Sequence, residues 1–288
     1  MFANILELLS ALRRRPHGGP LFATASLATF LGIWVLFVPA SISQPAAKPR
    51  LNLDDFRVIF EEEFNQLSVS ARGPNTRWIA HTPWNGDFGD AAFADPEPNF
   101  PFTVLNGILR IEARKSPDGK WRSGLLSSRA ADGLDAPGFA HQYGYFEMRA
   151  KLPAGPGVWP AFWLIGVDKS QYSSEIDVIE QYGAFPDVYH VAAQVHKKDG
   201  RRDAEGQKIW VRHGIMSESF NLYGVLIDPD WVIFYFNREE VWRTRTKSEF
   251  RQRFYILLNL ALGSGWPIHE TPNPSFMYVD YVKVFERN

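Results

Sequence analysis

The stretch Ser174-Glu175-Ile176-Asp177-Val178-Ile179-Glu180-Gln181-Tyr182 places three carboxylates among residues that favour a buried β-strand. Glu175 and Asp177 are two residues apart, so their side chains point to the same face of a strand. Glu180 is three residues beyond Asp177 and would point to the opposite face of a regular strand. A β-bulge at Val178-Ile179 adds one residue and returns Glu180 to the face of the other acids. Without the bulge Glu180 would lie in the core, so the apolar pattern predicts the bulge.

Three carboxylates on one face of one strand repel one another, so a chemical requirement best explains their grouping. Retaining glycoside hydrolysis has such a requirement, because it uses a nucleophile and an acid/base about 5–5.5 Å apart. A third acid between them can hydrogen-bond the nucleophile, and coupling keeps one member protonated near neutral pH. A wet strand edge and a calcium cluster are the alternatives. Calcium sites normally use loop oxygens that wrap the ion, which a flat strand lacks.

Short apolar or alternating runs, separated by turn residues, dominate the chain on both sides of this strand. In residues 146–152 apolar and polar side chains alternate, as in a strand with one buried and one wet face. Turn signals such as Asn106-Gly107 and Asp199-Gly200 lie between the runs. The pattern predicts an all-β sandwich or jelly roll. Strands are expected at residues 104–113, 143–152, 158–167, 176–181, 189–196, 222–227, 231–237, 255–262 and 278–285.

The longest stretch without such a run is residues 76–102, which carries four prolines. Long loops without secondary structure are usually functional or disordered. Trp78, Trp84, Phe88 and Phe93 argue against disorder. We therefore expect a loop at the rim of a cleft.

Composition excludes several classes of protein. The 288 residues are 45% hydrophobic and 15% aromatic, which is typical of a globular chain. Lys and Arg total 31 against 32 Asp and Glu, so the basic excess of a general nucleic-acid binder is absent and no nucleic-acid partner is expected. The absence of cysteine excludes disulfides, thiolate metal sites and a cysteine nucleophile. We expect a monomer.

The N-terminal residues have the pattern of an export signal. The basic cluster Arg13–Arg15 precedes an apolar run at residues 21–38, and the next charged residue is Lys48. Ser41 and Ser43 offer a small-x-small cleavage site.

The same run is long enough to span a bilayer if it is not cut, and it would then tether the chain to the inner membrane with its basic end inside. The sequence leaves open whether the segment is cleaved. It predicts a signal peptide or signal-anchor helix with a spacer at residues 1–47. Residues 48–288 are predicted to form one exported domain, periplasmic or extracellular.

The segment Glu175-Ile-Asp-Val-Ile-Glu180 resembles the signature of family 16 glycoside hydrolases. It has the bulged form of the laminarinase-like and agarase-like branches, with two residues between the Asp and the second Glu. Tyr143-Gly-Tyr-Phe-Glu-Met-Arg-Ala-Lys-Leu152 and Val158-Trp-Pro-Ala-Phe-Trp-Leu164 match the strands that lead into it. Tyr255-Ile-Leu-Leu-Asn-Leu-Ala-Leu-Gly263 and Val279-Asp-Tyr-Val-Lys-Val284 match the closing strands. The similarity covers nearly the whole exported domain.

The resemblance implies a concanavalin A-like β-jelly roll of two curved antiparallel sheets, with the acidic strand on the concave side. It makes Glu175 the nucleophile, Asp177 its hydrogen-bonded helper and Glu180 the acid/base. It implies no cofactor for the chemistry. It also suggests a structural Ca²⁺ on the convex side, from Glu63, the Gly107 carbonyl and Asp280.

Four tryptophans are candidates for binding sugar rings, because aromatic faces pack against the apolar C–H surface of a sugar. Trp159 and Trp163 are four residues apart, so both can face the cleft, and core packing is the alternative for each. The resemblance assigns Trp159 to ligand stacking and Trp163 to the floor beneath the nucleophile. Trp84 and Trp266 are loop aromatics near the presumed ends of the cleft.

Two polar residues are further candidates for substrate binding. His196 fits the strand after the signature, where it could adjust Glu180 or bind the leaving-group sugar. Asn259 lies in an otherwise apolar strand and must find hydrogen-bond partners, either a sugar hydroxyl or a backbone group. Glu147 and Arg149 are expected to pair on the wet face of their strand.

The sequence therefore predicts an exported retaining endo-β-glycosidase that cuts internal bonds of a polysaccharide, either a β-glucan or a bacterial exopolysaccharide. The segment Trp-Ile-Ala-His-Thr-Pro-Trp at residues 78–84 faintly resembles exopolysaccharide-processing bacterial members of the family. Two alternatives are a transglycosylase with the same residues and a non-catalytic glucan-binding module on the same fold. Such modules typically lose the catalytic acids, and all three are present here.

Overall fold

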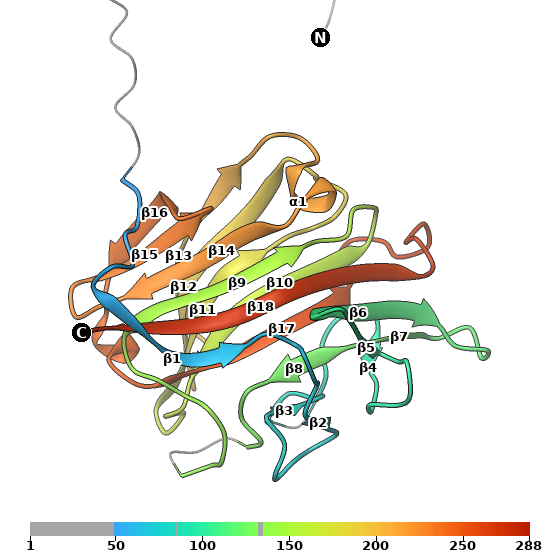
Figure 1. The fold of residues 1–288 in the computed structure, drawn as a ribbon, viewed down its shortest axis with the longest axis horizontal. Coiled ribbons are helices and arrows are strands. Elements are labelled where there is room, and N and C mark those ends of the chain that lie inside the picture. Colours follow the sequence, from blue (N-terminus) through green and yellow to red (C-terminus); the bar gives the residue numbers. More distant parts are fainter. Residues whose placement is uncertain (1–48, 85, 132–134) are drawn as a thin grey trace, which may run out of the picture. The chain divides into compact units, whose positions relative to one another are not determined.

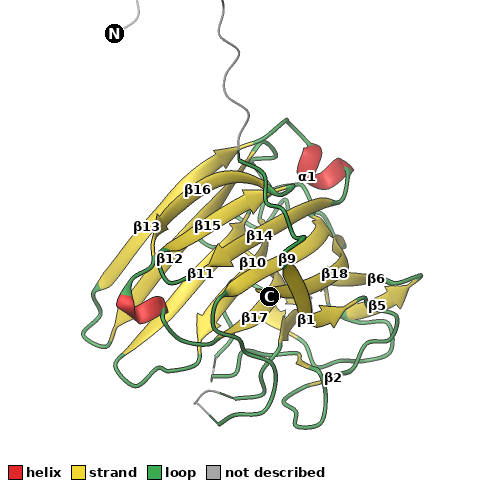
Figure 2. Ribbon diagram, turned by 60° about the vertical axis from the view of Figure 1, so that its left-hand side comes forward, coloured by secondary structure: helices red, strands yellow, loops and turns green. Residues whose placement is uncertain are grey.

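Two β-sheets packed face to face make up the described part of the chain in this computed structural model (Figures 1 and 2). The structure describes residues 49–84, 86–131 and 135–288. The predicted export segment, residues 1–47, lies outside them and stays a prediction. None of the helices in these described ranges is long and apolar enough to cross a membrane.

Strand order defines the two layers. The ten-stranded sheet contains β16 (Glu239–Arg245), β15 (Trp231–Phe236), β14 (Asn221–Ile227), β9 (Gly144–Lys151), β18 (Ser275–Arg287), β6 (Ile108–Lys115), β7 (Trp121–Ser123) and β4 (Ala92–Phe93), with β1 (Phe56–Glu62) on β18 and β5 (Phe102–Leu105) on β6. The eight-stranded sheet contains β13 (Arg202–Trp210), β12 (Val188–Lys197), β11 (Tyr172–Glu180), β10 (Val158–Gly166), β17 (Phe254–Leu262), β8 (Leu125–Ser127), β3 (Trp78–Ile79) and β2 (Val69–Ser70). The described helical segments are α1 (Ile215–Glu218) and η1 (Ser248–Phe250).

The core lies between the sheets and follows the alternation of each strand. On β6, Leu109 and Ile111 are fully buried, whereas Arg110 between them points away from the core. The central strands β10 and β17 have few exposed residues, and their paired residues Phe162 and Leu258 are both 0% exposed. Central strands covered on both faces carry near-continuous apolar runs, which explains why β17 reads Phe-Tyr-Ile-Leu-Leu-Asn-Leu-Ala-Leu.

The predicted all-β jelly roll is confirmed, with two local differences. The long strands pair antiparallel as expected, but the short pairs β2–β3 and β4–β7 are parallel. The predicted rim loop, residues 76–102, contains β3 and β4 and ends at the first residue of β5. Short strands with two residues carry too little pattern to be recognised from sequence.

The expected pairing of Glu147 with Arg149 is wrong. Glu147 is completely buried, and it accepts hydrogen bonds from Tyr145 (2.8 Å) and from two nitrogens of Arg238 (2.9 Å each). Arg149 pairs instead with Asp280. Near Glu147, Tyr145 belongs to an apolar cluster on which Leu51, Leu53 and Phe56 pack, so the expected wet face is covered there.

Replacing a core leucine should cost far more stability than replacing an exposed one. We expect Leu258→Ala to lower the free energy of unfolding by about 2–5 kcal/mol, because it leaves a cavity between the sheets. Leu105→Ala is the matched control, since Leu105 is 70% exposed and its loss should change stability by less than about 0.5 kcal/mol. Urea denaturation followed by tryptophan fluorescence measures both. Equal midpoints would show that this part of the core is not closely packed.

Candidate active site

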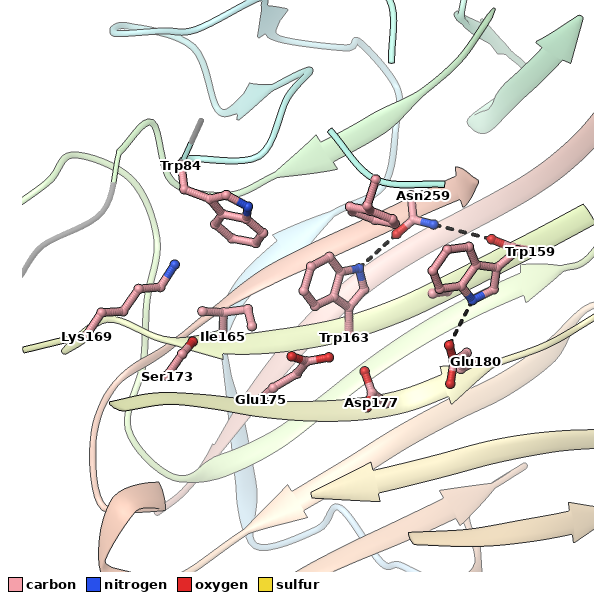
Figure 3. Close-up of a pocket in the computed structure, with 12 residues that line it drawn as sticks. Trp84, Trp159, Trp163, Ile165, Lys169, Ser173, Glu175, Asp177, Glu180 and Asn259 are labelled. Atoms are coloured by element: carbon pink, nitrogen blue, oxygen red, sulfur yellow. Dashed lines mark hydrogen bonds between the residues drawn. The ribbon is translucent and has the colours of Figure 1, made fainter. Parts of the chain in front are cut away.

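The acids of β11 reach the same side of the eight-stranded sheet because the strand bulges between Asp177 and Glu180. Asp177 pairs with Ala192 of β12 and Glu180 pairs with His190, so three steps on β11 match two on β12. The pairing with β10 shifts at the same point. Figure 3 shows Glu175, Asp177 and Glu180 projecting from β11 toward one pocket. The predicted bulge is confirmed.

A hollow of about 490 Å³ lies over these three carboxylates. Its volume is in the usual range for small-molecule sites. Aromatic side chains from two regions of the chain form much of its wall: Trp84, Phe88, Trp159 and Trp163. Acids beneath aromatic walls are the combination that a sugar-binding site with acid/base chemistry requires.

Glu175 is held by His196, whose Nε2 lies 2.9 Å from Oε2 of the carboxylate (His196 is 40% exposed in its side chain). Of the two roles predicted for His196, adjusting Glu180 is therefore wrong, and binding the leaving-group sugar stays a prediction. In the antiparallel register His196 pairs with Ser173, two residues before Glu175, whereas His190 pairs with Glu180. The register between two strands depends on the turn that joins them, and the register of β12 on β11 could not be read from the sequence.

Asp177 lies between the two glutamates and is almost completely buried. Burial, followed by the charges of Glu175 and Glu180, raises the pKa of Asp177 well above its ordinary range. Burial therefore favours the neutral form of this carboxyl, and in that form it can donate a hydrogen bond to Glu175. Its other oxygen accepts a hydrogen bond from Nε2 of Gln194, and Oε1 of Gln194 in turn accepts one from Nε of Arg202 at 2.5 Å.

Glu180 has two donors, the indole nitrogen of Trp159 and the hydroxyl of Tyr182, and both bind its Oε1 at 2.9 Å. Burial and the charge of Glu180 raise the pKa of Tyr182 to about 12, so the phenol stays protonated and donates at neutral pH. The two glutamates thus have different partners, which suits different roles.

Trp163 and Asn259 form the floor of the hollow. The indole nitrogen of Trp163 donates to Oδ1 of Asn259 at 2.8 Å, and the Asn259 amide donates to the Trp159 carbonyl at 3.4 Å. Asn259 is 0% exposed. Of the two partners predicted for it, a sugar hydroxyl or a backbone group, the structure shows the backbone group, and the indole of Trp163 is an additional partner. From β17, Asn259 thus fixes both tryptophans of the neighbouring strand β10.

The segment 76–102 forms one rim of the hollow, as predicted. Trp84 lies 6.0 Å from Trp163 between ring centroids, and Nζ of Lys169 lies 4.1 Å above the Trp84 ring. Both ring nitrogens of His81 face carboxylates, Asp87 at 3.3 Å and Asp95 at 2.9 Å, and these contacts fix the segment from within.

Trp266 is outside the lining of the hollow. It is 42% exposed and lies next to Phe185 and Tyr182, with centroid distances of 5.0 and 6.2 Å. Because Tyr182 binds Glu180, Trp266 marks the Glu180 end of the site.

Several site residues escaped the sequence analysis. Tyr182 stood at the end of the acidic stretch, and its even spacing from Glu180 was the signal that could have identified it. Gln194 had no such signal, because it reaches the site from the neighbouring strand β12. Lys169 lies in the turn between β10 and β11, and Phe88 was expected at the rim only as part of the segment 76–102.

The residues suggested for calcium do not fit that role here. The Glu63 carboxylate is 2.5 Å from Nζ of Lys283, and Asp280 pairs with Arg149. The Glu63 carbonyl does lie close to Gly107, as expected if both belonged to one site. The carboxylates of Glu63 and Asp280, however, already have cationic partners. Within the described ranges no group of three or more His, Asp or Glu side chains is arranged to hold a metal ion.

Comparison with known proteins agrees with this geometry. Residues 109–283 match the model of glycosyl hydrolases family 16. The chain belongs to this family. It is 32% identical over 262 residues to endo-1,3-1,4-beta-glycanase ExsH of Rhizobium meliloti (strain 1021), covering 82% of this chain and 53% of the relative. The chain spans about half the length of the first curated relatives it matches.

Solved structures show the same fold. The laminarinase catalytic domain of Thermotoga maritima MSB8 superposes with a TM-score of 0.61 at 23% identity, covering 82% of this chain and 100% of that one. A variant of SCLam, a non-specific endo-beta-1,3(4)-glucanase of family 16, gives a TM-score of 0.63 at 25% identity over 85% and 98% of the two chains. That variant was crystallised with a glucan oligosaccharide at its active site.

Neutralising Asp177 should change how stability depends on pH. The folded state raises the pKa of Asp177, so the folded protein holds a proton that the unfolded chain releases above about pH 4. Unfolding therefore becomes easier as pH rises from there to the raised pKa, by up to about 1.4 kcal/mol per pH unit. Asp177→Asn lacks this proton, so the wild type should lose stability relative to the variant across that window. Parallel stability curves from urea denaturation at stepped pH would contradict a neutral Asp177.

Proposed function

We propose that this domain is an endo-acting β-glycosidase that hydrolyses internal bonds of a polysaccharide with retention, by double displacement. The observation that carries the proposal is the row of Glu175, the buried Asp177 and Glu180 on one face of β11, beneath a hollow with tryptophan walls. A retaining site needs a nucleophile and a separate acid/base, and these are the positions that Glu175 and Glu180 offer.

In the first step Glu175 attacks the anomeric carbon and Glu180 gives its proton to the leaving glycosidic oxygen. The bond between that carbon and oxygen breaks, and a covalent glycosyl-enzyme forms on Glu175. His196 and Asp177 orient the nucleophile. Burial and the two neighbouring glutamates favour the neutral form of Asp177, and in that form it adds no third negative charge beside Glu175.

In the second step Glu180, now a carboxylate, takes a proton from a water molecule. The water oxygen attacks the anomeric carbon and releases Glu175, so the sugar keeps its original configuration. Trp159 and Tyr182 both donate hydrogen bonds to Oε1 of Glu180 and so fix the position of this carboxyl. The same acid thus serves as proton donor and then as proton acceptor.

The proposed substrate is a β-glucan with 1,3 or 1,4 linkages. Relatives with endo-1,3-1,4-beta-glycanase and endo-1,3-beta-glucosidase names support this class. The tryptophan walls of the hollow suit the flat C–H faces of glucose rings. A bacterial exopolysaccharide with such linkages is included in the proposal, and it would meet the enzyme outside the cell if the predicted export segment functions.

Removing the nucleophile should abolish hydrolysis. We expect Glu175→Gln to lower the release of reducing ends on the order of 10³-fold or more. The panel should contain β-1,3-glucan, mixed-linkage glucan, a galactan and a bacterial exopolysaccharide. Glu239→Gln is the matched control, because Glu239 is an exposed glutamate on β16 and its loss should leave the rate unchanged. Equal rates in the two variants would refute the assignment, and products longer than the substrate would identify a transglycosylase.

Substrates with a good leaving group should reveal the role of Glu180. Glu180→Gln should slow polysaccharide hydrolysis roughly 10²–10⁴-fold, because no acid then protonates the leaving oxygen. An aryl glucoside with a dinitrophenolate leaving group needs no such proton, so formation of its glycosyl-enzyme should be affected little. Burst-phase absorbance of the released phenolate separates this step from the second. An equal loss on both substrates would indicate a different acid.

A further inference from the structure

A row of cationic and aromatic side chains crosses the ten-stranded sheet on its outer face. In the strand register Thr103 of β5 pairs with Arg110 of β6, Arg110 pairs with Tyr278 of β18, and Tyr278 pairs with Lys151 of β9. Phe220, directly before β14, extends the row, with its ring 6.0 Å from Nζ of Lys151. These strands lie side by side in Figure 1.

This row borders a hollow of about 410 Å³ that is separate from the catalytic one. The Lys151 ammonium lies 4.9 Å from the ring centre of Tyr278, so it is held between Tyr278 and Phe220. Leu105, 70% exposed, forms another part of the wall. The volume is that of a small-molecule or single-sugar site, and the wall combines apolar surface with a fixed cation.

The wall of this hollow carries two cations, Arg110 and Lys151, and no acid. Arg110 shares Glu112 with Arg114, whereas Lys151 has no carboxylate within ion-pair distance among the described residues. Arg114 lies four residues beyond Arg110 on β6 and therefore on the same face. It borders a second hollow of about 580 Å³, where the charged residues of the wall are three cations and one acid: Arg114, Lys115, Arg122 and Glu97.

We propose that this outer face binds a segment of an anionic polysaccharide, with a sugar carboxylate on Lys151 and sugar C–H faces on Tyr278 and Phe220. Cations placed on several neighbouring strands, about 4.8 Å apart, suit a polymer with repeated negative charges better than one small anion. The rings supply apolar contact that a sugar can use and a phosphate ion cannot. The site is additional to the catalytic hollow, and the binding does not depend on hydrolysis.

The test uses the full chain carrying Glu175→Gln, so that no polymer is cut during the measurement. The probes are carboxymethylated β-1,3-glucan and the same glucan unmodified, which differ only in the carboxylates. Titration calorimetry should give tighter binding to the carboxymethylated polymer, weakened by salt. Adding Lys151→Met should raise its Kd roughly 10-fold, as expected for loss of one charged hydrogen bond, and should leave the Kd for the neutral glucan unchanged.

Lys198→Met is the matched control, because Lys198 is an exposed lysine beyond β12 of the other sheet. It should change neither Kd, and thermal denaturation should show that both variants are folded. An unchanged Kd in Lys151→Met, or an equal rise in the control, would overturn the proposal.

Vesicles of phosphatidylglycerol and phosphatidylcholine test the alternative occupant. If Lys151→Met releases the protein from vesicles without affecting the polymer, the face binds lipid and the glycan proposal fails. If the neutral glucan binds neither parent nor variant, only the catalytic proposal is in question.

Discussion

The bulge in β11 is the constraint on which the whole site depends. A strand alternates its side chains, so a regular β11 would have sent either Glu180 or the pair Glu175 and Asp177 into the core. The bulge keeps Val178 and Ile179 both buried, at 1% and 0% exposure, and returns Glu180 to the hollow. A bulge disrupts the ladder locally, but β11 is paired along both edges, with β10 and β12, which fixes the irregularity in place.

Once three acids share a face, their electrostatics follow from burial. Asp177 is the most buried of the three, and its burial together with the charges of both glutamates raises its pKa and favours its neutral form. Gln194 fixes Asp177 from the neighbouring strand, and Arg202 fixes Gln194 from the strand beyond. The eight-stranded sheet thus supports the catalytic strand laterally through diagonal contacts, each between side chains two residues out of register. Glu175 and Glu180 have different partners, a histidine for one and two neutral donors for the other, which supports the different roles proposed for them.

The features that the sequence predicted correctly depend on the residue pattern within one stretch of the chain. The features that it missed depend on the register between strands that are far apart in the sequence. The bulge, the all-β class and the rim segment all follow from spacing and composition within one stretch of chain. The contact of His196 with Glu175 depends on how β12 pairs with β11, and the sequence alone suggested the wrong glutamate. The environment of Glu147 was missed for a similar reason. The alternation within its own strand predicts a solvent-exposed face, but residues from the start of the domain cover that face.

The two faces of the sandwich have opposite chemistry, and this difference bears on how a charged polymer would be handled. The catalytic hollow contains carboxylates that must remain free to react, and they repel an anionic chain. Lys169 above Trp84 is a cation at its border and offsets part of that repulsion. The cations of the outer face lie away from the acids, so they can hold an anionic segment without pairing with Glu175 or Glu180. A chain with a net charge of only -1 can therefore attract such a polymer on one side while its reactive carboxylates stay unneutralised on the other.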